Sequence, residues 1–234
     1  MTQNGRRLAR IGGILYAVVF VAGLFGEVFV AGRLVVEGDG AATAARILGA
    51  ESLWRAAVSA QMLTMLCDVG IAWILYAILE PADRNLALFA ALLRLLYVPV
   101  YAVASYAQFI ALPFARQHLD TAVLLALRAH DGIFAMSLLL FGTHLAVAGY
   151  LFAKPPFSIR WLSWALGISG VCYVVNTLTV FASPPVHDAL FPWILLVPFA
   201  GELALCVWLL LGGPGRRRLA QARYRASASI TRES

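Results

Sequence analysis

The sequence predicts an all-α, polytopic membrane protein: a bundle of six transmembrane helices with two short interfacial helices on the outer side. Of its 234 residues, 62% are hydrophobic and 13% are charged, whereas soluble domains are about half apolar and about a quarter charged. The apolar residues fall in blocks of about 20, the length that an α-helix needs to cross a bilayer. A transmembrane barrel would show alternating segments of about 10 residues instead.

The N-terminal part predicts one span and one short helix. Residues 1–10 form a basic head, and the first span covers about 11–30. A basic head before an apolar run also occurs in secretory signals, but this block is too long and no small-residue cleavage site follows it. We therefore expect an uncleaved helix. After it, Glu37-Gly38-Asp39-Gly40 is predicted to form a turn, and Asp39 is expected to cap a short interfacial helix at 41–48.

The second and third spans are predicted to form a tight hairpin. The second covers 53–79, and Pro81 ends it within a polar turn. The third covers about 86–111, with a kink expected at Pro99 and an end at Pro113.

The C-terminal half continues the alternation of spans and polar connections. A segment at 116–130 reads as the second interfacial helix, with Asp120 in a capping position. A basic tail at 212–234 is expected to be disordered. The three remaining spans are expected at about 132–152, 161–181 and 190–211.

The placement of the basic residues predicts the orientation. Six spans put both termini on one side, which carries 12 of the Lys and Arg residues, against 5 on the other side. By the positive-inside rule, both termini are expected in the cytoplasm. The basic residues flank apolar blocks, so they indicate a lipid bilayer as partner rather than nucleic acid. The sequence leaves any protein partner unknown.

Four ionisable residues are predicted to meet inside the membrane. A carboxylate at Asp68, well inside the second span, costs several kcal/mol unless it is paired, protonated or hydrated. At 1.5 Å per residue, Asp68, Arg94, His144 and Glu202 all lie about 12–16 Å from the cytoplasmic helix ends. Because spans two and three are antiparallel neighbours, we expect an ion pair between Asp68 and Arg94. The predicted inner layer consists of Asp68, Arg94, His144 and Glu202.

Further polar residues are predicted nearer the outer side and along the helix faces. Residues 3, 4, 7 or 11 positions apart share one face of a helix, so the bundle is expected to have a polar seam that faces inward. A possible outer layer consists of Glu27, Arg55 and Asn176. The supporting polar face consists of Gln61, Thr64, Tyr97, Tyr101, Ser105 and Gln108.

Familiar catalytic motifs and metal-ligand spacings do not occur in the sequence, which assigns no catalytic residue, metal or cofactor. Three histidines on the outer side each lie near an acidic residue, so they could form a metal site or a pH-sensing site. Their spacing fits no known ligand motif, and we expect them to be ordinary polar loop residues. They are His118, His130 and His187. The cysteines, Cys67, Cys172 and Cys206, all fall inside spans and are expected to be free thiols.

Three functions remain open from the residues. The leading hypothesis is transport or binding of a small-molecule ligand or proton: Arg94 would hold an anionic group or neutralise Asp68, and Glu202 or His144 would exchange a proton. The alternative is a structural or partner-binding membrane protein whose buried polar residues hold helix to helix. An intramembrane enzyme using Glu27, Glu202 or His144 ranks last, because no nucleophile accompanies them.

Several segments, in order and spacing, resemble one family of bacterial multi-pass membrane proteins. They are Arg10-Ile11-Gly12-Gly13-Ile14-Leu15-Tyr16, Gly23-Leu24-Phe25-Gly26-Glu27, Glu51-Ser52-Leu53-Trp54-Arg55, Asp68, Ala87-Leu88 to Arg94-Leu95, Gly142-Thr143-His144, Gly149-Tyr150-Leu151 and Gly201-Glu202-Leu203. The chain resembles domain of unknown function family 4386 from about Arg10 to Leu211. The resemblance implies a bacterial inner-membrane protein, and it supplies no activity.

Overall fold

The computed structural model describes residues 3–213, and within this range every regular element is a helix. Six of these helices are long and apolar enough to cross a membrane. The predicted fold class is therefore confirmed, and the protein is a multi-pass membrane protein. The tail predicted at 212–234 falls outside the described residues, except for its first two positions.

The first span is built from three consecutive helical segments, and the other five spans are single helices. The first comprises α1 (Gln3–Gly23), the π-helical segment η1 (Leu24–Ala31) and α2 (Gly32–Leu34). The others are α4 (Glu51–Leu79), α5 (Arg84–Arg116), α6 (Asp120–Ala153), α7 (Arg160–Ala182) and α9 (Trp193–Leu210). Two short helices, α3 (Gly40–Gly49) and α8 (Pro184–Leu190), occupy the connections after the first and fifth spans.

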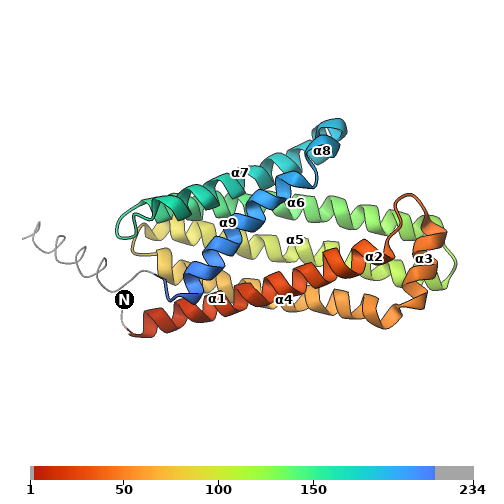
Figure 1. The fold of residues 1–234 in the computed structure, drawn as a ribbon, viewed down its shortest axis with the longest axis horizontal. Coiled ribbons are helices and arrows are strands. Elements are labelled where there is room, and N and C mark those ends of the chain that lie inside the picture. The colour runs from red at the N-terminus through yellow and green to blue at the C-terminus, as the bar shows by residue number, and fades with distance from the viewer. Residues whose placement is uncertain (1–2, 214–234) are drawn as a thin grey trace, which may run out of the picture.

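The six spanning helices form a closed ring in the order of the chain. Contacts run from α1 to α4, then to α5, α6, α7 and α9, and from α9 back to α1. In Figure 1 the long helices lie side by side, while α9 crosses the bundle obliquely towards the start of α1. Every spanning helix thus has a face that points towards the axis of the ring.

The helices are apolar outside and carry polar residues inside, the reverse of a soluble bundle. Val21, Leu66 and Trp164 expose 70% or more of their surface, whereas Arg94, His144 and Gln61 expose none. Lipid can cover an exposed apolar side chain, but a polar group in the bilayer needs a partner within the protein. The polar faces of the helices therefore point towards the axis of the ring and form the predicted polar seam.

The predicted tight turn joins α4 to α5 and is held by Asp83. One carboxylate oxygen of Asp83 accepts from the backbone N–H of Leu86 at 3.1 Å, which caps α5, and the other accepts from Lys154 Nζ at 3.0 Å. The Leu86 N–H and the Lys154 ammonium hold the pKa of Asp83 below its ordinary value. The predicted cap at Asp39 is also present, accepting from Ala42 N at 2.8 Å.

The prediction of a separate interfacial helix at 116–130 was wrong. This segment forms the first part of α6 and continues without a break into the predicted fourth span. A single glycine inside a helix, here Gly132, costs only about 1 kcal/mol. Packing offsets this, because Leu127 and Phe134 on either side of Gly132 contact apolar residues of α5. The second short helix at this end of the molecule is α8 instead.

Two further boundaries differ from the prediction for identifiable reasons. Helix α5 does not end at Pro113 but continues to Arg116; a proline removes one backbone donor, and the buried Leu112 and Ala115 keep this turn packed. The first span is helical from Gln3, so most of the predicted head belongs to α1. Arginine is a good helix former and its long side chain can extend to the membrane surface.

Candidate functional site

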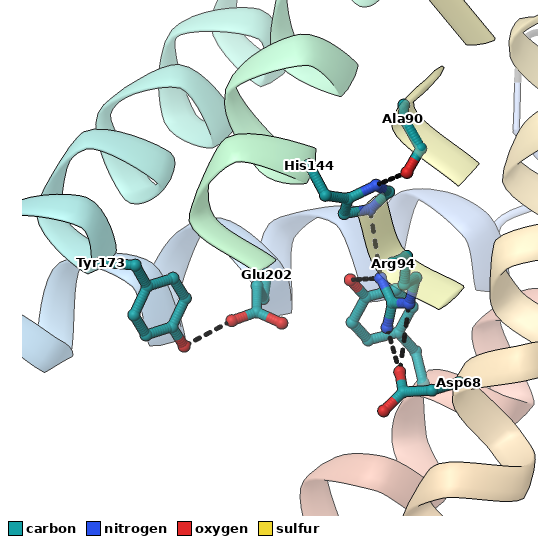
Figure 2. A network of polar contacts seen from close by, with 7 residues as sticks. Asp68, Ala90, Arg94, His144, Tyr173 and Glu202 are labelled. Carbon is teal, nitrogen blue, oxygen red and sulfur yellow. Dashed lines mark hydrogen bonds and ion pairs between the residues drawn. The ribbon is translucent and has the colours of Figure 1, made fainter. Parts of the chain in front are cut away.

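Each spanning helix contributes one polar side chain near the middle of the ring. Hydrogen bonds join four of these side chains in one group and the other two in a second group. We call this group the inner hexad. It comprises Tyr16 of α1, Asp68 of α4, Arg94 of α5, His144 of α6, Tyr173 of α7 and Glu202 of α9. Figure 2 shows the cluster from close by. The structure thus brings together the four residues of the predicted inner layer and adds two tyrosines.

Arg94 lies at the centre of the inner hexad and is completely buried. Its Nε and Nη2 both donate to Oδ1 of Asp68, at 3.1 and 2.5 Å. Its Nη1 donates to the Tyr16 hydroxyl at 2.8 Å and lies 3.4 Å from Nε2 of His144. The ion pair expected between spans two and three is therefore present, and every side-chain nitrogen of Arg94 has a partner (Figure 2).

The partners of His144 fix its tautomer. Nδ1 lies 2.8 Å from the backbone oxygen of Ala90, and because a carbonyl can only accept, Nδ1 carries a proton and donates. Nε2 faces Arg94, which can only donate, so Nε2 accepts. Both nitrogens are satisfied in the neutral ring, and the adjacent guanidinium charge opposes a second proton. This arrangement argues against His144 as the proton-exchanging group.

Glu202 is the second carboxylate of the inner hexad and exposes 6% of its surface. It accepts a hydrogen bond from the Tyr173 hydroxyl at 2.7 Å (Figure 2). Within residues 3–213 it forms no ion pair. Arg94 supplies one positive charge and already pairs with Asp68, so an ionised Glu202 would leave the hexad with a net negative charge.

A second polar cluster lies in the half of the bundle towards α3, and we call it the outer tetrad. Gln61 Nε2 donates to Oε1 of Glu27 at 2.6 Å and to Oε1 of Gln108 at 2.5 Å. The ring of His130 places Nε2 3.6 Å from Oε2 of Glu27 and Nδ1 2.9 Å from the Ala104 oxygen. The tetrad therefore joins the same four helical spans, first to fourth, that carry Tyr16, Asp68, Arg94 and His144.

Aromatic rings fill the space between the two polar clusters. Tyr97 and Tyr101 of α5 stack at 5.5 Å between ring centroids. Tyr97 contacts Phe141 at 5.0 Å, and the Arg94 guanidinium carbon lies 4.9 Å from the centre of the same ring. On the other side, Tyr101 contacts Phe134 at 5.5 Å. The predicted supporting face of α5 thus connects the hexad and the tetrad through a column of rings.

Other predicted site residues make local contacts only. Thr64 and Ser105 each donate to a backbone oxygen one helical turn earlier. Asn176 is buried on α7, and its Oδ1 has no partner among the described residues. Arg55 lies at the surface and pairs with Glu51 at 2.8 Å. The predicted outer layer is therefore not a single cluster: only Glu27 belongs to the tetrad.

The sequence reasoning did not assign three residues that the structure places in these clusters: Tyr16, Tyr173 and His130. Tyr16 and Tyr173 carry no charge that would mark them in the sequence as partners of the buried ionisable residues. The sequence predicts His130 at the end of a separate segment at 116–130, whereas in the structure it lies inside the continuous helix α6. Among the described residues, no group of three or more His, Cys, Asp or Glu side chains is arranged to hold a metal ion.

Comparison with known proteins places the chain in a family. The model of a family described as "Domain of unknown function (DUF4386)" matches residues 11–213, which include every member of both polar clusters. An uncharacterized protein from Archaeoglobus fulgidus is 25% identical over 151 residues, or 64% of this chain and 80% of the relative. Proteins similar to this one are therefore not confined to bacteria. No solved structure matches the chain. The chain belongs to the DUF4386 family.

Proposed function

We propose that the protein binds and transports a small solute across the membrane, coupled to protonation of Glu202. The observation that carries the proposal is the inner hexad, in which all six spanning helices contribute to one buried site with one cation and two carboxylates. Intramembrane ionisable groups mark substrate and proton pathways more often than ordinary packing positions. A group shared by all six helices is also placed to link their relative positions to its charge.

The roles within the hexad follow from its contacts. Asp68 neutralises Arg94, and Arg94 is the group that an anionic solute would approach. His144 is satisfied as a neutral ring, so Glu202 is the remaining proton-exchanging group. Protonation would remove the surplus negative charge while leaving a carboxyl oxygen to accept from Tyr173. The proton is thus coupled to the contact between α7 and α9.

We place the protein in the plasma membrane with both termini in the cytoplasm. The end of the bundle at which α1 begins and α9 ends carries Arg6, Arg7, Arg10, Arg84, Lys154 and Arg160. Basic residues flanking membrane spans favour the cytoplasmic side. The outer tetrad then lies in the half of the bundle that faces away from the cytoplasm.

The test uses the full chain reconstituted in liposomes with a pH-sensitive dye inside. Panels of small anionic, cationic and neutral solutes are added under an imposed pH gradient. We expect one solute class to drive proton movement with wild type, and Glu202→Gln to abolish it. Glu80→Gln, which removes a surface carboxylate, serves as the matched control and should retain the flux. Proton movement that persists in Glu202→Gln would contradict the assignment, and a full panel without flux would contradict transport.

A structural role is the second candidate, and the complete pairing of Arg94 favours it. Because each side-chain nitrogen of Arg94 already has a protein partner, the hexad can hold helices together without any ligand. This candidate expects that replacing Asp68 and Arg94 together with leucine restores the stability lost in either single variant. A solute site would instead lose binding in the double variant, whatever its stability.

A further inference from the structure

The outer tetrad contains His130, whose surroundings differ from those of His144 in the partner of Nε2. Both rings use Nδ1 to contact a backbone oxygen of α5, at 2.9 Å for His130 and 2.8 Å for His144. Nε2 of His144 faces the Arg94 guanidinium, whereas Nε2 of His130 faces the Glu27 carboxylate at 3.6 Å. The partner of Nε2 is therefore a permanent donor in one case and an acceptor in the other.

The contact between His130 and Glu27 requires one proton. The Ala104 oxygen can only accept, so Nδ1 of His130 carries a proton. In the neutral ring, Nε2 would then present a lone pair to a carboxylate oxygen, and the two would repel. A proton on Nε2 makes this 3.6 Å contact an ion pair, and a proton on Oε2 lets the carboxyl donate towards Nε2. The protonated pair is also neutral as a whole, which favours it inside a membrane.

The other groups around the pair leave this proton in place. Glu27 Oε1 already accepts from Gln61, whose amide is oriented by Gln108. Three further ionisable groups near the pair are Tyr101 of α5, Asp131 of α6 and Glu37 of the α2–α3 connection, and all three are acids. None of these named groups supplies a positive charge, as Arg94 does in the hexad. A bound proton is therefore the charge that balances the Glu27 carboxylate.

The pair can also exchange its proton more readily than the hexad. The Glu27 side chain is 31% exposed, whereas Glu202, the proton-exchanging group of the hexad, exposes 6% of its surface. Glu27 lies in η1, where the backbone adopts the wider π-helical turn. Such turns are rare and are frequent at functional sites. At 1.5 Å per residue, Glu27 is about 10 Å from the end of the first span at Leu34.

We propose that Glu27 and His130 form a second proton-binding site, which holds one exchangeable proton between Oε2 and Nε2 in the half of the bundle opposite the basic helix ends. Binding forms one N–H or O–H bond with a proton taken from water and changes the charge of the pair from −1 to zero. Release returns the proton to water and restores the charge. The site goes beyond the proposed function, because it requires neither a solute nor Glu202.

The test is nitrogen NMR of the full chain, with isotope-labelled histidine, in liposomes at neutral pH. His130→Gln identifies the His130 signals, and His144 is an internal control because its Nε2 should carry no proton in any sample. Infrared spectroscopy of the same sample reports whether the Glu27 carboxyl is protonated, and Glu27→Gln identifies that band. We expect the proton on one of the two groups, seen as a doubly protonated His130 ring or as a protonated Glu27 carboxyl.

Three results would overturn the proposal, and the first two concern the pair itself. The first is a wild-type protein in which His130 Nε2 has no proton while Glu27 is ionised. The second is a doubly protonated His130 ring that persists in Glu27→Gln, because the proton would then not depend on the carboxylate. The wild-type spectra decide the first point even if a variant fails to fold. Glu80→Gln, which removes a distant surface carboxylate, should leave the His130 signals unchanged. A matching loss of the second proton in Glu80→Gln would also refute the pairing.

Discussion

His130 and His144 lie 14 residues apart on α6, and the two α5 oxygens that they contact, those of Ala104 and Ala90, are also 14 residues apart. The two contacts therefore belong to one antiparallel register of α5 against α6. They are separated by about 21 Å along the helix. Each histidine uses Nδ1 to contact a backbone oxygen of α5. Its Nε2 faces a charged residue, which is Glu27 for His130 and Arg94 for His144. The sign of that residue's charge decides which histidine can bind a proton.

Removing the charge of Asp68 is expected to destabilise the protein strongly. Asp68→Leu leaves the buried Arg94 without its counter-ion, and breaking a buried ion pair on one side costs about 3–5 kcal/mol. Thermal unfolding in detergent micelles measures the loss. In the double variant Asp68→Leu with Arg94→Leu, most of the loss should be recovered, since neither member of the ion pair is left without its partner. A single variant as stable as wild type would contradict the pairing.

Tyr16→Phe is expected to weaken the hexad while preserving its packing. The change removes only the hydroxyl that accepts from Arg94 at 2.8 Å and leaves the buried ring in place. Hydrogen bonds to charged groups are worth about 1.5–3 kcal/mol, so the unfolding free energy should fall by this amount. Tyr106→Phe is the matched control, because Tyr106 is 63% exposed, and it should change stability little. Equal effects of both variants would rule out a specific role for the Tyr16 hydroxyl.

Gly170→Ala is expected to disturb the contact between α6 and α7. A Cβ atom at Gly170 would collide with the backbone oxygen of Gly142 and would lie 2.7 Å from the Ala146 nitrogen. Overpacking of this kind costs about 1–3 kcal/mol. The same substitution at Gly167, where nothing lies within 4 Å of the added atom, should be neutral or stabilising by about 0.5–1 kcal/mol. Unfolding midpoints of the two variants, compared with wild type, check the contrast.

The link between Asp83 and Lys154 is expected to stabilise the protein only within a range of pH. Its partners lower the pKa of Asp83 from 3.8, so the contribution of Asp83 is present above that value and is lost as pH falls through the lower folded pKa. The Asp83 carboxylate likewise raises the pKa of Lys154 from 10.5; that contribution is present below 10.5 and is lost as pH rises through the higher folded pKa.

Asp83→Asn tests this range because asparagine can still cap α5 but carries no charge. At pH 7 the variant should unfold at a lower temperature than wild type. The difference should shrink as the pH falls below about 3.8. Asp83→Ala, which also removes the cap at Leu86, should lower the unfolding temperature further. A difference between wild type and Asp83→Asn that is independent of pH would show that the charge is not the cause.

The long helices and the central ion pair could be predicted because both depend on short-range patterns. Block length sets the spans, and a tight turn forces α4 and α5 to be antiparallel, which brings Asp68 to Arg94. The cluster residues that the sequence did not predict depend instead on how the helices pack together. Tyr16 of α1 accepts from Arg94 of α5, a helix that is not its neighbour in the ring, and Tyr173 of α7 donates to Glu202 of the next spanning helix, α9. Arg55 was misplaced because Glu51, one turn away, pairs with it at the surface.

The closed ring in chain order also has a consequence for how the protein enters the membrane. Helices α4 and α5 are joined by a short turn, so they can insert as one hairpin in which Asp68 and Arg94 neutralise each other from the start. Neither charge then has to cross the lipid alone. Glu202 arrives last of the six, on α9, when the helix that carries its partner Tyr173 has already emerged from the ribosome. The order of synthesis thus delivers each buried acid to partners that precede or accompany it.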